Sequence, residues 1–289
     1  MPNLSDADRI AAAALAEDGD TDVTTDVTVP PGTTAEGLIE YRDGGVLAGS
    51  AFADAVARAC RLAVEWRSED GAVIVPGIPV GRVRGELAAI LRAERPMLNL
   101  LQRACGIATV TRAYVDAVRG TQCRILHTRK TAPGIRALDV AAVVAAGGER
   151  HRVDLAHEVM VKDNHWQALG RQGLAQALAQ AKKRGVTALY VEVESLDQVE
   201  VACAAGATRL LVDNQSPETV RDWGRRARAL VADIEIEATG GITMANVRGY
   251  AEADADFVSI GALTHSVRAA DLALEVRVLQ KNKAADERR

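Results

Sequence analysis

ALYVEVESLDQVEVACAAGATRLLVDN, residues 188–214, contains the most informative local pattern in this chain. Two short apolar runs, 188–193 and 209–212, enclose a segment that opens with SLDQ at 195–198, which resembles a helix capping box. The pattern predicts a strand, a helix and a second strand, and parallel strands need such a crossover. Glu192, Glu194 and Asp213 then lie at the carboxyl ends of two neighbouring strands.

The same pattern recurs along the chain from about residue 123. Four more buried runs, at 123–128, 158–161, 234–238 and 257–260, alternate with helical signals such as residues 173–184 and Ser216-Pro217. Six strands separated by helices predict an α/β fold with a parallel barrel at residues 116–267. In such a barrel the carboxyl ends of the strands converge on one mouth, where active sites are built.

The first 115 residues follow a different pattern. They contain an acidic segment at 17–20, a Pro30-Pro31-Gly32 turn, a predicted strand at 37–41 and predicted helices at 51–63 and 98–118. These features favour a smaller α/β domain at residues 1–115. A C-terminal helix at 268–289, with a polar tail at 281–289, is predicted to pack on this domain.

Composition excludes several classes of protein. The 289 residues carry a net charge of −4, which argues against a nucleic-acid-coating surface. The four cysteines are dispersed and indicate neither disulfides nor a zinc site. No signal segment or membrane-spanning run is present in the sequence, so a cytoplasmic protein with no membrane partner is expected.

Basic side chains cluster near the predicted strand ends. Several guanidinium and ammonium groups at one mouth suit a ligand with multiple negative charges. A single surface arginine is more often simply solvated, so only the set as a whole indicates such a ligand. The basic set, with one adjacent histidine, consists of Arg95, Arg129, Lys130, His151, Arg152 and Lys162. The histidines His157 and His165 are expected to be structural.

Two further groups point to a phosphorylated ligand. Glu192 and Asp213 offer oxygen ligands suited to Mg²⁺, although as an isolated pair they are more often surface or salt-bridge groups. The strings GGIT at 240–243 and GALTHS at 261–266 follow strands, so their backbone N–H groups can hold a phosphate at a helix N-terminus. A tight turn is the alternative for each glycine string.

An ordered series of motifs resembles the quinolinate phosphoribosyltransferase family across about residues 15–275. The strings are ERPMLNLLQR (94–103), GIAT (106–109), TRKTAPGIR (128–136), HR (151–152), VKDNH (161–165), VEVE (191–194), DN (213–214), TGGI (239–242) and SIGALTH (259–265). The resemblance implies an N-terminal open-faced α/β sandwich followed by an incomplete α/β barrel.

The resemblance also implies site residues. Arg129, Lys130, His151 and Arg152 would bind the two carboxylates of quinolinate, and Arg95 would enter from a partner subunit, which requires at least a homodimer. Lys130, Lys162, Glu192 and Asp213 would be catalytic, with the two acids serving Mg²⁺ and phosphoribosyl pyrophosphate. The residues that would hold the 5-phosphate are Thr239, Gly240, Gly241 and Gly261, and His265 would also bind substrate.

The implied reaction transfers phosphoribosyl to quinolinate with loss of CO₂, giving nicotinate mononucleotide for NAD biosynthesis. No organic cofactor is implied, only Mg²⁺. Several positions depart from the family pattern around the acceptor pocket, namely His127, Val140, Ala141, Ala146, Arg150, Asp154 and His157. These departures leave two alternatives open: a relative that uses another aromatic or heterocyclic acid, or a non-catalytic binding protein on the same fold.

Overall fold

The computed structural model describes residues 4–280, and its internal contacts divide the chain into two compact units. The first unit comprises the chain up to Arg112, Thr131–Gly147 and the chain from Leu263 on; the second comprises Ala113–Lys130 and Gly148–Ala262. The observed change at Arg112 lies close to the expected boundary at residue 115. Thr131–Gly147 was expected in the barrel domain but belongs to the first unit, where Arg103 holds the buried Asp139 at 2.7 Å.

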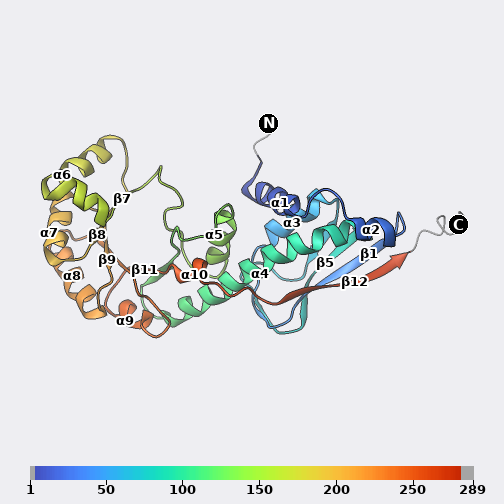
Figure 1. The fold of residues 1–289 in the computed structure, drawn as a ribbon. Helices are drawn as coiled ribbons and strands as arrows, with labels where there is room; N and C mark the ends of the chain where they lie inside the picture. The colour runs from blue at the N-terminus through green and yellow to red at the C-terminus, as the bar shows by residue number, and fades with distance from the viewer. Residues whose placement is uncertain (1–3, 281–289) are drawn as a thin grey trace, which may run out of the picture. The chain divides into compact units, whose positions relative to one another are not determined.

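The second unit is built on a six-stranded parallel sheet with helices on its outer side (Figure 1). Its elements are β6 (Arg124–Leu126), β7 (Val159–Val161), α6 (Asp163–Lys183), β8 (Leu189–Val193), α7 (Leu196–Ala205), β9 (Arg209–Asp213), α8 (Pro217–Leu230), β10 (Glu235–Thr239), α9 (Val247–Glu252) and β11 (Phe257–Ser259). All six strands coincide with the six runs expected from the sequence.

The strand order shows an incomplete barrel. Strands lie in the order β6-β11-β10-β9-β8-β7, so β6 pairs with β11 instead of with β7, its successor in the chain. This is the order of a six-stranded barrel opened between its first and second strands. The expected α/β class with an incomplete parallel barrel is therefore confirmed.

The first unit contains a four-stranded antiparallel sheet in the order β12-β1-β5-β3. Its elements are α1 (Asp6–Glu17), α2 (Val23–Thr28), β1 (Thr34–Tyr41), β2 (Gly45–Val46), α3 (Ser50–Ala59), β3 (Ala63–Trp66), β4 (Val73–Ile74), β5 (Ile78–Glu86), most of α4 (Leu87–Ala117), α5 (Arg136–Ala145), most of α10 (Ala262–His265) and β12 (Leu272–Gln280). Alternate residues of β1 are buried, and its other face carries Glu36 against Arg82 and Arg84, so one face of the sheet is polar.

The helix expected at residues 268–289 is wrong for the described part of that segment. Residues 272–280 form strand β12, which pairs antiparallel with β1. The sequence LALEVRVLQ places apolar residues at every second position from Leu272 to Val278, which is the period of a strand. Residues 281–289 lie outside the described part of the chain.

Polar side chains cap the N-termini of α7 and α8, the helices that follow β8 and β9. The Ser195 hydroxyl accepts from the Gln198 N–H, and the Gln198 side chain accepts from the Glu194 N–H, one residue before the usual capping-box partner. Ser216 caps α8, with Pro217 at its first turn. Within residues 4–280, no helix is long and apolar enough to cross a membrane.

Candidate functional site

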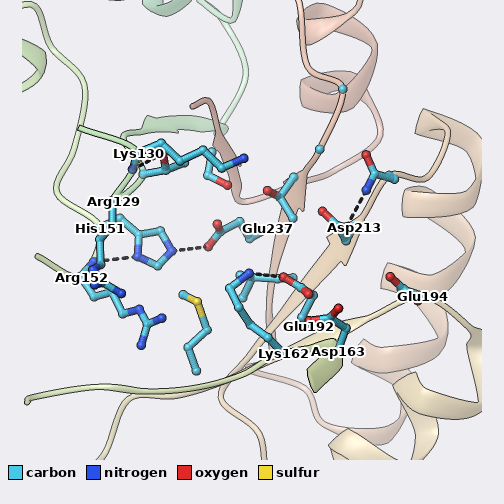
Figure 2. Close-up of a pocket in the computed structure, with 18 residues that line it drawn as sticks. Arg129, Lys130, His151, Arg152, Lys162, Asp163, Glu192, Glu194, Asp213 and Glu237 are labelled. Carbon is cyan, nitrogen blue, oxygen red and sulfur yellow. Dashed lines mark hydrogen bonds and ion pairs between the residues drawn. The ribbon is translucent and has the colours of Figure 1, made fainter. Parts of the chain in front are cut away.

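A cavity of about 600 Å³ lies within the second unit, at the carboxyl ends of its strands. This volume is in the range of small-molecule sites. The lining residues come from all six strands and the segments that follow them: Thr128, Arg129, Lys130, His151, Arg152, Met160, Lys162, Asp163, Glu192, Glu194, Leu211, Asp213, Asn214, Glu237, Thr239, Gly240, Gly241 and Ser259. Figure 2 shows the charged members facing the same space.

Strand register explains why these side chains meet. Glu192 on β8 pairs in register with Leu211 on β9, which is level with Glu237 on β10. Because side chains alternate along a strand, Asp213 and Thr239, two residues further, point the same way and lie one layer nearer the mouth.

The acidic side of the cavity contains a carboxylate pair and a lysine. Lys162 forms an ion pair with Glu192, whose side chain is 9% exposed (Figure 2). Burial raises the pKa of Asp213, as does the negative charge of Glu192, and Lys162 offsets part of that increase. The two carboxylates therefore repel one another where a cation would relieve the repulsion.

This donor set fits Mg²⁺. Among the described residues there is no group of three or more His, Cys, Asp or Glu placed to hold a metal. Mg²⁺ commonly takes only one or two carboxylates and completes its shell with water and substrate phosphates. Glu192 and Asp213 would supply those carboxylates.

The opposite side of the cavity is basic. Arg129 and Arg152 each have a buried Nε with no hydrogen-bond partner. Burial lowers the pKa of Arg152, and so does the charge of Arg129, whereas Glu158 raises it. Two partly desolvated guanidinium groups close to one another suit a ligand with anionic oxygens, which would satisfy their unpaired N–H groups.

His151 lies between this basic group and the floor of the cavity, where both of its ring nitrogens are engaged. Its Nδ1 accepts from the Arg152 N–H at 2.6 Å, and its Nε2 lies 3.1 Å from Glu237 Oε2. The expectation that His151 binds a substrate carboxylate directly does not fit this geometry, because neither ring nitrogen remains for the ligand.

Glu237 was missed from the sequence and is fully buried. It also pairs with Arg209 at 3.2 Å, and the Arg209 guanidinium stacks over the rings of Tyr190 and Phe257 at 4.6 and 3.8 Å. A signal was available in IEIEA at 234–238, where glutamates alternate with apolar residues in a strand expected to be buried. Other cavity residues that were not predicted are Thr128, Met160, Asp163, Glu194, Leu211, Asn214 and Ser259.

None of the residues that depart from the family pattern is among those that line the cavity. His127 is fully buried, and its Nε2 accepts from the His151 N–H at 3.1 Å, a bond that an aspartate could also accept. Val140, Ala141 and Ala146 lie in or at the end of α5 in the first unit. Arg150, Asp154 and His157 are not lining residues; Asp154 accepts from the Ala156 N–H and pairs with His157 at 3.0 Å.

A glycine turn follows β10 at the cavity edge. Gly240 has φ +79°, and a Cβ there would lie 2.3 Å from the Asn214 Oδ1, so only glycine fits without rearrangement. The turn was expected to open directly into a helix, but α9 begins later, at Val247. Backbone N–H groups of the turn, instead of a helix N-terminus, are thus available to an anion.

Three predicted site residues do not line the cavity. Gly261 follows β11 within the second unit, whereas Arg95 and His265 belong to the first. The Arg95 side chain is 69% exposed, with Glu94 at 3.7 Å, and His265 lies 2.6 Å from the Ser266 hydroxyl. The expected structural role of His165 is seen, because its Nδ1 accepts from the Lys162 N–H at the start of α6.

Comparison with known proteins gives consistent matches along the chain. Residues 22–105 match the model "Quinolinate phosphoribosyl transferase, N-terminal domain", and residues 107–275 match the corresponding C-terminal domain. The "Nicotinate-nucleotide pyrophosphorylase [carboxylating]" of Mycobacterium leprae is 39% identical over 259 residues, 88% of this chain and 91% of that protein.

Solved structures agree with this result. The nicotinate-nucleotide pyrophosphorylase from Francisella tularensis matches with a TM-score of 0.87 and 30% identity, over 95% of this chain and 98% of that one. NadC from Streptococcus pyogenes also has a TM-score of 0.87, with 33% identity over 97% of this chain and all of that one.

Proposed function

Because the chain belongs to the quinolinate phosphoribosyltransferase family, we propose that it transfers phosphoribosyl from phosphoribosyl pyrophosphate to quinolinate, with loss of CO₂. The products are nicotinate mononucleotide, pyrophosphate and CO₂. The observation that supports this function best is the division of one cavity into a basic side and a carboxylate side.

The basic side is the acceptor pocket. Arg129 and Arg152 bind the two carboxylates of the acid, since their buried, unpartnered Nε atoms require an anionic partner. Lys130 lines the same side and adds a third positive charge. Fixing both carboxylates orients the ring nitrogen toward the donor sugar.

The carboxylate side is the donor pocket. The glycine turn at Thr239–Gly241 holds the 5-phosphate through backbone N–H groups, and Lys162 faces the pyrophosphate. When bound, Mg²⁺ neutralises charge that builds up on the leaving pyrophosphate. Glu192 and Asp213 would hold that ion, and they also present negative charge toward a sugar with oxocarbenium character.

The reaction proceeds by exchange of one bond at the anomeric carbon. The pyridine nitrogen forms a bond to this carbon while the bond to the pyrophosphate oxygen breaks, and the departing group carries away the electron pair. Lys162 and Lys130 stabilise its charge. The ring nitrogen is then cationic, so the adjacent carboxylate can leave as CO₂, and the ring carbon takes up a proton.

A homodimer or larger homo-oligomer is part of this proposal. Arg95 is highly exposed on α4, which suits a side chain that serves the active site of a partner subunit. Mixing two chains that carry different inactivating substitutions tests this assignment.

The decisive experiment is an assay of pyrophosphate release by the purified chain with phosphoribosyl pyrophosphate, Mg²⁺ and an acceptor acid. Quinolinate should support release together with an equal amount of CO₂, and nicotinate, which lacks the second carboxylate, should not. Release with another aromatic acid but not with quinolinate would contradict the acceptor assignment. Donor binding without release for any acid would favour a non-catalytic protein.

A further inference from the structure

Hydrogen bonds define the proton positions of two histidines at the cavity. The His151 Nδ1 accepts the Arg152 N–H, so it carries no proton, and the proton must lie on Nε2, facing Glu237. The His127 Nε2 accepts the His151 N–H, so the His127 proton lies on Nδ1, 3.1 Å from the Thr128 carbonyl. In both rings, therefore, the nitrogen that accepts the backbone N–H is fixed by the hydrogen bond it makes.

Glu237 is suited to act as the acceptor for His151. Its burial raises its pKa, but the hydrogen bond from His151, the electrostatic attraction to His151 and the positive charge of Arg209 outweigh this effect, so the pKa is lowered overall. Arg209 is itself only 8% exposed and its guanidinium contacts the rings of Tyr190 and Phe257, so its position is constrained. An ionised carboxylate can only accept, which selects the tautomer with the proton on Nε2.

The two histidine rings hold two consecutive backbone amides, those of His151 and Arg152. This matters because residues 150–158 form neither helix nor strand, so no regular ladder positions them. A parallel bridge from Leu126 to Glu149 attaches the residue before this segment to the edge of β6 that does not pair with β11. Beyond this bridge, the two histidine contacts hold the backbone that carries the Arg152 guanidinium.

We propose that Glu237, paired with Arg209, is a positioning residue for acceptor binding: it orients His151, and His151 fixes the backbone of Arg152. Glu237 thereby acts on the acid without touching it. The inference rests on the proposed function and assigns a role to a chain of contacts that runs from the floor of the barrel, at Arg209, to the acceptor pocket.

Two substitutions of Glu237 test the hydrogen bond that it accepts from His151, because one keeps an acceptor oxygen and the other removes it. Glu237→Gln keeps an oxygen that accepts from the His151 Nε2–H, whereas Glu237→Leu does not. Glu237→Leu should raise the KM for quinolinate roughly tenfold to hundredfold, with the KM for phosphoribosyl pyrophosphate unchanged within about twofold. Glu237→Gln should raise the KM for quinolinate less than about threefold, which would be rescue by the conservative side chain.

A matched control is available two residues away on β10. Glu235 pairs with the same Arg209 at 2.8 Å but is 39% exposed, and no hydrogen bond joins it to His151 among the described contacts. Glu235→Gln should leave the KM for quinolinate unchanged. The positioning role is overturned if Glu237→Leu leaves the KM for quinolinate unchanged, if it raises both KM values alike, or if Glu237→Gln is as harmful as Glu237→Leu.

Two readouts do not depend on turnover. Nitrogen-15 spectra of the His151 imidazole should show the proton on Nε2 in the wild type, and a proton on Nδ1 would contradict the inference. Calorimetry with quinolinate should show weaker binding to Glu237→Leu than to Glu237→Gln. If the wild type binds the acid but releases no pyrophosphate, the proposed reaction fails while these two measurements still decide the role of Glu237.

Discussion

Arg152 carries its charge into the acceptor pocket as a planar guanidinium, and the shape of that group can be tested separately from its charge. Arg152→Lys keeps the charge but loses paired hydrogen bonding, so the KM for quinolinate should rise roughly tenfold. Arg150→Lys makes the same change at an exposed residue that does not line the cavity, and it should have no effect. Equal KM values for quinolinate in the two variants would contradict the carboxylate-binding role.

Asp213 illustrates a conflict between stability and function. Burial and the charge of Glu192 raise its pKa. Protonated Asp213 therefore contributes to the free energy of unfolding at acid pH, and this contribution is lost as the pH rises through the raised pKa. Without metal, Asp213→Asn should melt at nearly the same temperature as the wild type in acid and at a higher temperature near neutral pH.

Activity should change in the opposite direction to stability. Loss of one carboxylate from the Mg²⁺-binding pair should reduce turnover by a factor on the order of a hundred or more. Melting curves over a pH series without Mg²⁺, together with Mg²⁺ titrations of activity, check both parts. A metal-free wild type that is more stable than Asp213→Asn at neutral pH would show that the carboxylate is not under repulsion.

The sequence predicted the residues at the strand ends more successfully than those within the strands. Lys162 and Asp213 directly follow apolar runs, Glu192 lies one residue before the end of one, and a barrel brings strand ends together whatever the details of packing. Glu237 and Arg209 were not identified, because the alternation in residues 234–238 shows only that the two glutamates share one face of a buried strand. The structure adds the partners of that face, since Glu237 is fully buried and contacts both His151 and Arg209.

Among the turns, the glycine pair after β10 supports a test with two neighbouring positions. Both glycines have positive φ, but a Cβ at Gly240 would meet Asn214 at 2.3 Å, whereas a Cβ at Gly241 meets nothing within 4 Å. Gly241→Ala should cost about 1 to 3 kcal/mol of backbone strain. Gly240→Ala should introduce the same backbone strain, and its Cβ should also displace either the Asn214 side chain or the turn itself.

We therefore expect the KM for phosphoribosyl pyrophosphate to rise more in Gly240→Ala than in Gly241→Ala, by roughly tenfold, while the KM for quinolinate changes little in either. Steady-state kinetics with each substrate varied in turn measure the difference. Equal effects of the two substitutions would mean that strain alone, and not displacement of the turn, accounts for the loss.

Element prediction succeeded where burial imposed a clear pattern and failed where two patterns competed. Buried parallel strands have continuous apolar runs, so all six barrel strands were found. Every second residue from Leu272 to Val278 is apolar, but this period of two was not recognised and a terminal helix was predicted instead. Likewise α6 starts at Asp163, ten residues before the predicted helix, with Gly170 in a non-helical conformation inside it.

At the scale of the whole molecule, the proposed contribution of Arg95 to a partner's site predicts that two inactive variants restore activity when mixed. Arg95→Ala and Asp213→Asn should each be nearly inactive. In a mixed dimer, the chain with Ala at position 95 keeps an intact barrel, and its partner supplies Arg95, so one of the two sites is complete. Random pairing makes half of the dimers mixed, so about a quarter of wild-type activity should return.

The matched control combines two variants in the barrel itself, Lys162→Ala and Asp213→Asn. No mixed dimer of these chains has a complete site, because each barrel carries its own defect, so activity should not recover. Activity is measured after the chains are unfolded together and refolded at a one-to-one ratio. Full activity of Arg95→Ala alone, or no recovery when it is mixed with Asp213→Asn, would show that each chain completes its own site.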